Sequence, residues 1–206
     1  DSRNFIELQA DLFFDTGQMD TAAVWYDNLL DEFPFDTYYW EQMGRINYEK
    51  GDFARARDCF EYIEAIDPEN KSARMMCADC IFSRGQWKQA FGIYSSLLDE
   101  DPDSYALLYY CGRCEYENKC YDGALPYFRK SFESLTHEDG EIPTEMLVEL
   151  YGYMAHCTYY LKDIPQTLSI LADGLALDPE DSFLQEVWFM MFGSETGSAN
   201  EKQQTK

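Results

Sequence analysis

The chain has 206 residues, of which 46% are hydrophobic and 17% aromatic. That is enough apolar material to build a core, which excludes intrinsic disorder for everything except the last residues. Sixteen Lys and Arg residues against 39 Asp and Glu give a net charge of −23. A surface this negative repels nucleic-acid phosphates and anionic lipid heads. The composition therefore predicts no nucleic-acid partner, and no apolar run is long enough for membrane insertion.

Four series of residues recur at a common spacing of 34 residues. The series are Gly17, Gly51 and Gly85; Pro34, Pro68 and Pro102; Ala22, Ala56, Ala90 and Ala124; and Tyr26, Phe60, Tyr94 and Phe128. A fixed period of this length indicates a repeat architecture. It predicts units over residues 3–36, 37–70, 71–104 and 105–138, and a fifth over 148–181 after nine extra residues.

The unit over residues 37–70 shows why each repeat folds as two helices. Its first helix places four residues on one face, at helical spacing: Trp40, Met43, Gly44 and Asn47. Gly51 ends that helix because glycine readily adopts the turn conformation that other residues resist. The second helix carries Ala56, Phe60 and Ile63 on its buried stripe and ends at Asp67, since a residue before proline avoids helical angles.

The pattern "WEQMGRIN…GDFARARDCF…DP" resembles the tetratricopeptide repeat. This resemblance implies an all-α, right-handed superhelical solenoid of about five helix-turn-helix repeats, with the first helices lining a concave groove. The chain departs from the family pattern at five positions: Asn47, Lys119, Lys162, Thr167 and Gly174. We expect the solenoid to occupy residues 1–193, with a capping helix over 182–192 and a polar, disordered tail over 194–206.

The nine extra residues lie around "HEDGEIPTE", from His137 to Glu145. Proline is tolerated in the first turn of a helix. We therefore expect the next helix to begin at Pro143 and to run to about Leu161, where its overhang could form one lip of the groove.

Two C-x-x-C pairs, Cys77/Cys80 and Cys111/Cys114, look at first like a zinc site. Their separation is the repeat period itself, and the matching positions of other units hold residues such as Leu12 and Ile46. Because a buried free cysteine packs as a small hydrophobe, we predict core packing, no metal and no cofactor. A thiol-based metal or redox module remains the weaker alternative.

One aromatic residue stands three positions before each turn: Phe14, Tyr48, Phe82, Tyr116 and Tyr159. In the family, residues on the inner face of the first helix contact ligands. Other inner positions hold Glu41, Arg45, Asp79, Tyr109, Arg113 and His156. Together these side chains predict a groove for a protein or peptide segment with basic and apolar side chains. Packing between successive first helices, or a merely solvated acidic face, is the alternative.

The last predicted helix, "SFLQEVWFMMF", carries more apolar residues than one buried stripe needs. On a helical projection Phe183, Leu184, Val187 and Trp188 face the fifth unit, together with two methionines. Phe189 and Phe192 then point away, which predicts a contact surface for a partner or a second copy.

We predict a protein-interaction scaffold or adaptor, with a self-assembling structural subunit as the alternative. Neither histidine belongs to a catalytic triad and no phosphate-binding glycine loop occurs, so no enzyme activity is expected. The chain begins at Asp1 without an initiator methionine or a signal-peptide pattern, which suggests a processed or excised piece. Seven cysteines inside helical patterns favour a reducing, cytoplasmic setting.

Overall fold

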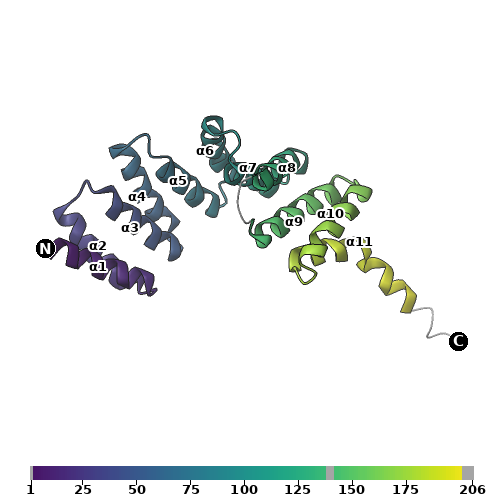
Figure 1. Cartoon of the computed structure of the whole chain (residues 1–206), viewed down its shortest axis with the longest axis horizontal. Coiled ribbons are helices and arrows are strands. Elements are labelled where there is room, and N and C mark those ends of the chain that lie inside the picture. The colour runs from purple at the N-terminus through teal and green to yellow at the C-terminus, as the bar shows by residue number, and fades with distance from the viewer. Residues whose placement is uncertain (1, 138–141, 201–206) are drawn as a thin grey trace. The chain divides into compact units, whose positions relative to one another are not determined.

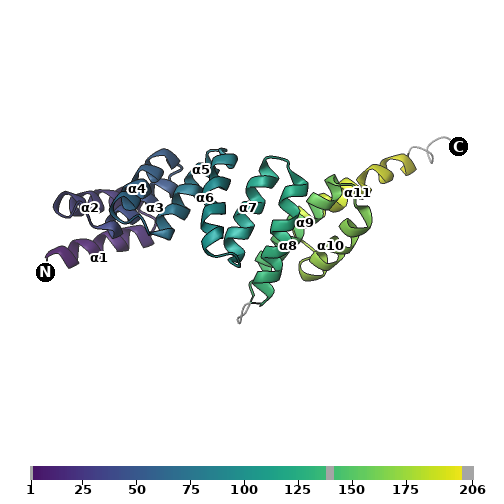
Figure 2. The same ribbon diagram turned by 90° about the horizontal axis from the view of Figure 1, so that it is seen from above.

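The computed structural model describes residues 2–137 and 142–200, and within these ranges its only regular elements are helices (Figures 1 and 2). They are α1 (Ser2–Asp15), α2 (Met19–Glu32), α3 (Thr37–Glu49), α4 (Phe53–Ile66), α5 (Lys71–Ser83), α6 (Trp87–Glu100), α7 (Tyr105–Glu117), α8 (Tyr121–His137), α9 (Thr144–Tyr160), α10 (Ile164–Leu177) and α11 (Ser182–Asn200).

The helices form the predicted sequence of five pairs followed by a final helix, so the predicted all-α repeat fold is confirmed. The ninth helix begins one residue after Pro143 and ends one residue before Leu161, as expected. The final helix does not end at Phe192 but continues to Asn200. The tail that was predicted to be disordered over 194–206 is therefore helical as far as Asn200, and its residues 201–206 lie outside the described residues.

The chain divides into two compact units, which are described separately below. Unit 1 comprises Asp1–Leu97 and unit 2 comprises Leu98–Lys206. In unit 1, α3 packs against its own second helix α4 and against α2, the second helix of the repeat before it, and in unit 2 α9 packs in the same way against α10 and α8. This two-sided burial is what makes a stack of repeats stable where a single pair would not be.

The turn between the helices of a pair has the same backbone form in every repeat. Gly17, Gly51 and Gly85 have φ between 74° and 76°. Lys119 and Lys162 occupy the equivalent turns with φ of 61° and 65°. The left-handed conformation is thus kept even where a side chain makes it costly.

Over the first four repeats, the contact between the two helices of a pair alternates between two sets of residues. In repeats 2 and 4 a phenylalanine ring lies on a glycine: a Cβ added to Gly44 would be 2.6 Å from Phe60, and one added to Gly112 would be 2.8 Å from Phe128. In repeats 1 and 3 a buried tyrosine takes the place of the phenylalanine and donates its hydroxyl hydrogen bond to an aspartate. These pairs are Tyr26 with Asp11 and Tyr94 with Asp79.

The cysteines of both C-x-x-C pairs lie inside helix packing. Cys77, Cys80, Cys111 and Cys114 are all at most 3% exposed. Burial raises the pKa of Cys80, Cys111 and Cys114 to about 12. Among the residues that the structure describes, no three His, Cys, Asp or Glu side chains are placed to hold a metal ion. The absence of bound zinc stays a prediction, to be checked by metal analysis of the purified protein.

Thiol titration should separate one cysteine from the other six. Cys120 is partly exposed, whereas the remaining six are buried and free. We expect Ellman's reagent to modify about one thiol in the native protein at pH 8, because the buried thiols are not accessible to the reagent. The hydrogen bond with Glu115 raises the pKa of Cys120, so even this reaction should be slow. Cys120→Ser should remove it, and all seven thiols should react in denaturant; several fast native thiols would contradict the buried packing.

Candidate functional site

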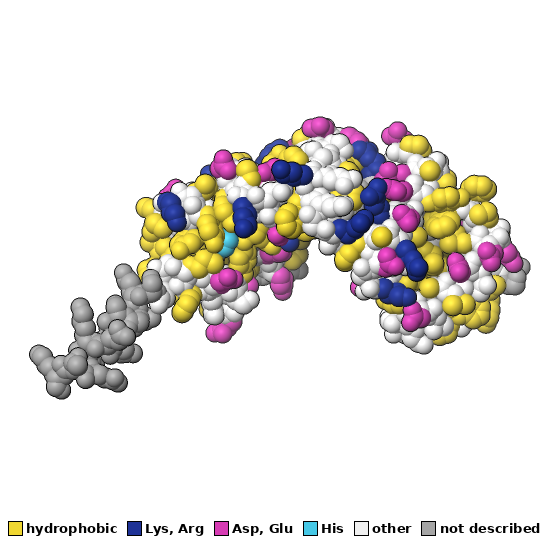
Figure 3. Space-filling model, turned by 180° about the vertical axis from the view of Figure 1, so that it is seen from behind, with side chains coloured by type: hydrophobic (Ala, Val, Ile, Leu, Met, Phe, Trp, Pro, Cys, Tyr) yellow, Lys and Arg dark blue, Asp and Glu magenta, His cyan; other side chains and the backbone are white. Residues whose placement is uncertain are grey.

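The densest group of predicted site residues lies on one face of unit 2, on the helices α7, α9 and α11. We call it the tyrosine face and define it by Tyr109, Arg113, Tyr116, Tyr153, His156, Tyr160 and Phe183. Its rings meet in a chain of edge and tilted contacts, with centroids 4.7 to 6.1 Å apart in four of them. Figure 3 shows hydrophobic side chains gathered around the cyan histidine on this surface.

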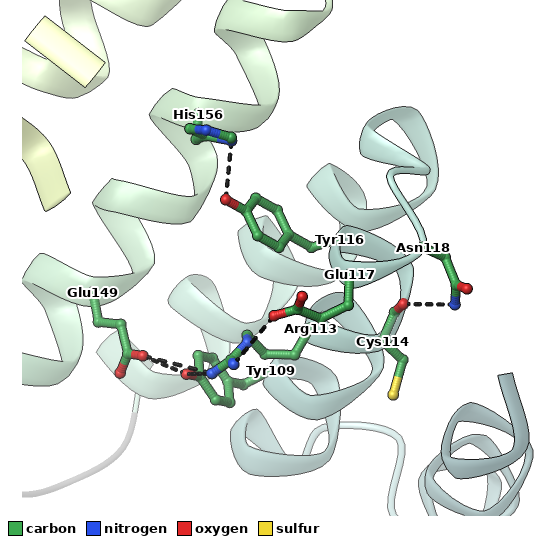
Figure 4. A network of polar contacts seen from close by, with 8 residues as sticks. All are labelled: Tyr109, Arg113, Cys114, Tyr116, Glu117, Asn118, Glu149 and His156. Carbon is green, nitrogen blue, oxygen red and sulfur yellow. Dashed lines mark hydrogen bonds and ion pairs between the residues drawn. The ribbon is translucent and has the colours of Figure 1, made fainter. Parts of the chain in front are cut away.

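Arg113 lies at the centre of a polar network between α7 and α9 (Figure 4). Its guanidinium donates to the Tyr109 hydroxyl at 2.9 Å, and that hydroxyl donates to Glu149 at 2.5 Å. The same guanidinium lies 3.9 Å from Glu149 and 3.5 Å from Glu117. It also sits 5.0 Å above the Tyr153 ring, within cation–π range. Two carboxylates therefore neutralise the one positive charge of the face.

His156 and Tyr116 form the second polar pair of the face. The Tyr116 hydroxyl lies 3.0 Å from Nδ1 of His156, and the imidazole is only 8% exposed. Burial lowers the pKa of His156, while Glu186 acts weakly in the opposite direction. Burial also raises the pKa of Tyr116, so both partners are uncharged near neutral pH, and the His156 tautomer decides which of the two atoms donates the hydrogen bond.

This pair predicts a loss of stability in mild acid. The unfolded chain takes up a proton on His156 as the pH falls through its ordinary pKa of about 6.5, whereas the folded chain resists this to lower pH. The free energy of unfolding should therefore fall below about pH 6.5 and level off once the folded imidazole is charged. The titratable groups near the His156 imidazole are Tyr116, Tyr121, Tyr160 and Glu186.

Urea unfolding from pH 7.5 to 5 should show this fall in the wild type and a smaller one in His156→Gln. His137 and the carboxylates are common to both proteins, so they cancel in the difference. Parallel pH profiles would show that His156 is not the group responsible.

An acidic hollow adjoins the tyrosine face in unit 2. It lies where the start of α9, the end of α10 and the start of α11 meet, and its lining residues are Thr144, Glu145, Val148, Glu149, Leu177, Asp178, Asp181 and Phe183. Four of these carry carboxylates and none is basic. Asp178 and Asp181 each use one oxygen to accept a backbone N–H, from Glu180 and Leu184 respectively. Glu149 and Phe183 line the hollow and also belong to, or touch, the tyrosine face.

The predicted groove residues of unit 1 are mostly occupied by contacts inside that unit. Asp79 accepts from Tyr94, and burial raises its pKa although that hydrogen bond lowers it. Arg45 pairs with Glu41 at 2.7 Å, one helical turn away. The Tyr48 hydroxyl lies 3.0 Å from the Ser83 hydroxyl. Phe14 and Phe82 are partly buried on α1 and α5, and Phe14 packs against the unit 1 core.

Tyr159 also departs from the simple groove picture. Its hydroxyl donates to the backbone carbonyl of Met190 on α11 at 3.4 Å. The alternative of packing between successive first helices thus describes Tyr159 well, and it describes Tyr116 in part.

The exposed aromatics of α11 are not the predicted pair. Phe189 is 69% exposed, as expected, but Phe192 is partly buried and its ring lies 4.4 Å from that of Trp188. Trp188, expected to cover the fifth unit, is 48% exposed instead. The expectation for Phe192 was therefore wrong, because a helical projection shows direction and not which neighbour fills the space.

The tyrosine face and the acidic hollow contain candidate functional residues that the sequence analysis missed. They are Glu117, Glu145, Glu149, Tyr153, Tyr160, Asp178, Asp181 and Phe183. Glu149 contacts Tyr109 from 40 residues away, across the interruption that breaks the 34-residue register. Ten of the 16 tyrosines fall between residues 105 and 160, and this concentration was the signal available in the sequence.

The helix pairs and their common turn together define a protein of the tetratricopeptide-repeat class. The sequence profile of the family described as anaphase-promoting complex, cyclosome, subunit 3 matches residues 15–131, more than half of the chain. The chain belongs to this family. No curated protein matches it in sequence.

Solved structures share the fold at low sequence identity. MamA (residues 41 to the end) from Desulfovibrio magneticus RS-1 is 13% identical, with a TM-score of 0.76 over 88% of this chain and 98% of that one. YrrB, described as a tetratricopeptide protein with an unusual peptide-binding site, is 18% identical, with a TM-score of 0.67 over 86% of this chain and 87% of that one. At these identities the likeness supports the solenoid class of fold.

In the part of the chain that the structure describes, no helix combines the length and the apolar character needed to cross a bilayer. The predicted cytoplasmic setting stays a prediction.

Proposed function

We propose that the chain is a protein-interaction scaffold whose tyrosine face and acidic hollow bind an extended segment of a partner protein. The segment carries a lysine or arginine beside apolar or aromatic side chains. The observation that carries the proposal is the hollow itself, in which four carboxylates surround the apolar side chains of Val148, Leu177 and Phe183. Such a lining accepts the methylene stem of a basic side chain on its apolar walls and the charge at its rim.

The tyrosine face supplies the rest of the binding surface. Tyrosine rings offer large, stiff contact area together with a hydroxyl, which is why they are common at interfaces. Tyr160 is 43% exposed, and Tyr109, Tyr116 and Tyr153 are partly exposed beside it. Because Arg113 is already neutralised by Glu117 and Glu149, the face does not repel a basic segment. The peptide-binding site named for YrrB gives a precedent within the same fold.

The test uses peptides selected from a random display library on the whole chain. We expect the selected peptides to be enriched in Lys or Arg next to aromatic or aliphatic residues. Fluorescence anisotropy with one selected peptide should show at least about tenfold weaker binding to Glu145→Gln/Glu149→Gln, since two of the four carboxylates are removed. Binding should weaken as salt rises, and less steeply in the variant.

The matched control is Glu133→Gln/Glu180→Gln, which changes the net charge equally at exposed positions outside the hollow. It should bind like the wild type. Equal losses of affinity in both variants would mean that the net charge of the chain, and not the hollow, causes the effect. Selected peptides without basic residues would contradict the proposal that the partner segment carries a lysine or arginine. The expected lack of enzyme activity stays a prediction, and so does the oligomeric state of the chain.

A further inference from the structure

Unit 2 has a second concave site, which shares no residue with the tyrosine face or the acidic hollow. We call it the proline pocket, and its lining residues are Leu98, Asp99, Pro102, Leu108, Pro126, Tyr127 and Lys130. They come from the end of α6, the loop that follows it, α7 and α8. The pocket has a volume of about 360 Å³, and five of its seven lining residues are apolar or aromatic. This size and lining are typical of a site that takes one large apolar group.

The repeat register shows why the chain is hollow at this place. Two periods earlier, the positions of Leu108 and Lys130 hold Trp40 and Tyr62, whose ring centroids lie 4.4 Å apart. The rest of the frame is the same, since Leu30, Asp31 and Pro34 correspond to Leu98, Asp99 and Pro102. Repeat 4 therefore has a leucine and a lysine where repeat 2 has two aromatic rings, and the pocket is the space that those rings occupy in repeat 2.

Side chains bridge the same gap at two further places in the chain. Between repeats 4 and 5, Tyr151 takes the position of Leu108 once the nine extra residues are counted, and its ring lies 5.1 Å from that of Phe132. Between repeats 2 and 3, Arg74 takes this position and donates to the Ser96 hydroxyl at 3.3 Å. Two of these three gaps are thus filled by a pair of aromatic rings.

Repeat 2 also indicates which ring suits the pocket. There Nε1 of Trp40 donates to the backbone carbonyl of Pro34 at 2.7 Å. The equivalent carbonyl of Pro102 accepts from the Lys130 ammonium at 2.7 Å, and this ammonium also lies 3.4 Å from Asp103. A carbonyl oxygen has two lone pairs, so that of Pro102 can accept an indole N–H beside the lysine. The ammonium at the rim also attracts the face of an aromatic ring, most strongly that of tryptophan.

A further repeat at either end of the chain would not cover this pocket. It lies in the interior of the sequence, and the positions that fill the gap in repeat 2 are already occupied here by Leu108 and Lys130. The tryptophan of unit 2, Trp188, lies on α11, which packs against α9 and α10. A second copy would bring another chain of net charge −23, and such repulsion disfavours self-association.

The pocket opens to solvent, because Pro102 and Pro126 on its edges are exposed. A ring bound there has one edge at the surface, where the backbone that carries it can continue. The proline rings are also rigid walls, which lose little freedom when a ligand binds.

We infer that the proline pocket binds the tryptophan side chain of a partner protein. The indole takes the place that the rings of Trp40 and Tyr62 take in repeat 2, and its N–H donates to the carbonyl of Pro102. This site is additional to the binding surface proposed above, and either can fail without the other.

The test uses the capped tripeptide Gly-Trp-Gly and the full chain with ¹³C-labelled leucine methyl groups. We expect saturable shifts of the Leu98 and Leu108 methyl signals, since the ring current of an indole acts on groups in contact with it. Gly-Phe-Gly should bind at least about threefold more weakly, because it lacks the N–H donor. Gly-Ala-Gly should cause no saturable shift.

Lys130→Tyr places the equivalent of Tyr62 in the pocket, so the affinity for Gly-Trp-Gly should fall at least about tenfold. Lys130 is exposed, and circular dichroism verifies that the variant remains folded. The matched control is Arg129→Tyr, which makes the same change of charge and adds the same ring at an exposed position outside the lining. It should bind like the wild type. Leu108→Trp, the equivalent of Trp40, should also abolish binding.

Several results would overturn the inference. Unshifted Leu98 and Leu108 signals, or equal affinities of Lys130→Tyr and Arg129→Tyr, would show that the pocket does not hold the ring. A loss of binding in Glu145→Gln/Glu149→Gln would locate the peptide in the acidic hollow instead. Free indole that binds as tightly as Gly-Trp-Gly would make a small molecule the occupant. A dimer in light scattering that both Trp188→Ala and Lys130→Tyr dissolve would make a second copy the occupant.

Discussion

Phe128→Ala should lower the free energy of unfolding of unit 2 by about 3–5 kcal/mol, the range for removing a fully buried ring. The Phe128 side chain is 0% exposed and stacks on Tyr153 with ring centroids 5.0 Å apart. It also contacts the rings of Tyr109 and Tyr116. No neighbour can fill the vacancy without moving the tyrosine face, so peptide binding by unit 2 should weaken as well.

Urea unfolding followed by far-UV and near-UV circular dichroism measures this change. Phe189→Ala is the control, since it removes the same atoms at a position that is 69% exposed, and it should alter stability by no more than about 0.5 kcal/mol. A loss below about 1.5 kcal/mol for Phe128→Ala would mean that the helices of repeat 4 collapse onto the cavity.

Gly44→Val should destabilise unit 1 by about 3 kcal/mol, the upper end for an overpacked core. A Cβ at this position would lie 2.6 Å from the tip of the Phe60 ring, and that ring is fully buried and cannot turn away. Valine is the better helix former by a few tenths of a kcal/mol, so the propensity gain is far smaller than the clash.

The control for this prediction is another helical glycine, Gly92 of α6, where an added Cβ meets nothing within 4 Å. Gly92→Val should change stability by no more than about 0.5 kcal/mol. Three of the four tryptophans, Trp25, Trp40 and Trp87, lie in unit 1, so their fluorescence reports its unfolding. If both variants behave alike, the close approach of Phe60 to Gly44 is not what limits this position.

The helix pairs could be predicted because the signals that define them are local. A turn glycine, a proline after the second helix and a small residue at the crossing recur at one period, and Pro143 marked the restart after the interruption. Even the interpretation of the cysteines followed from register alone. Each of these features depends on residues within one repeat or on its nearest copy.

The candidate site was less predictable because its contacts join different repeats. Tyr109 and Glu149 are 40 residues apart and related by no fixed period. Asp79 was assigned to the groove, although the sequence contained the information needed to find its partner, Tyr94. The repeats that have an aspartate at this position, Asp11 or Asp79, have a tyrosine on the second helix, and the repeats that have an arginine there have a phenylalanine. The exposure of Trp188 depended on which side of α11 the other helices cover.

The alternation of tyrosine–aspartate and phenylalanine–glycine pairs means that single repeats of this chain are not interchangeable modules. A second helix from repeat 1 joined to the first helix of repeat 2 would bring the Tyr26 hydroxyl beside Arg45, which offers no hydrogen-bond acceptor. The reciprocal chimera would press Phe60 against the methyl group of Ala10 and remove the hydrogen bond that Tyr26 donates to Asp11. The smallest block that can be duplicated, deleted or transplanted with its internal chemistry intact is a pair of successive repeats.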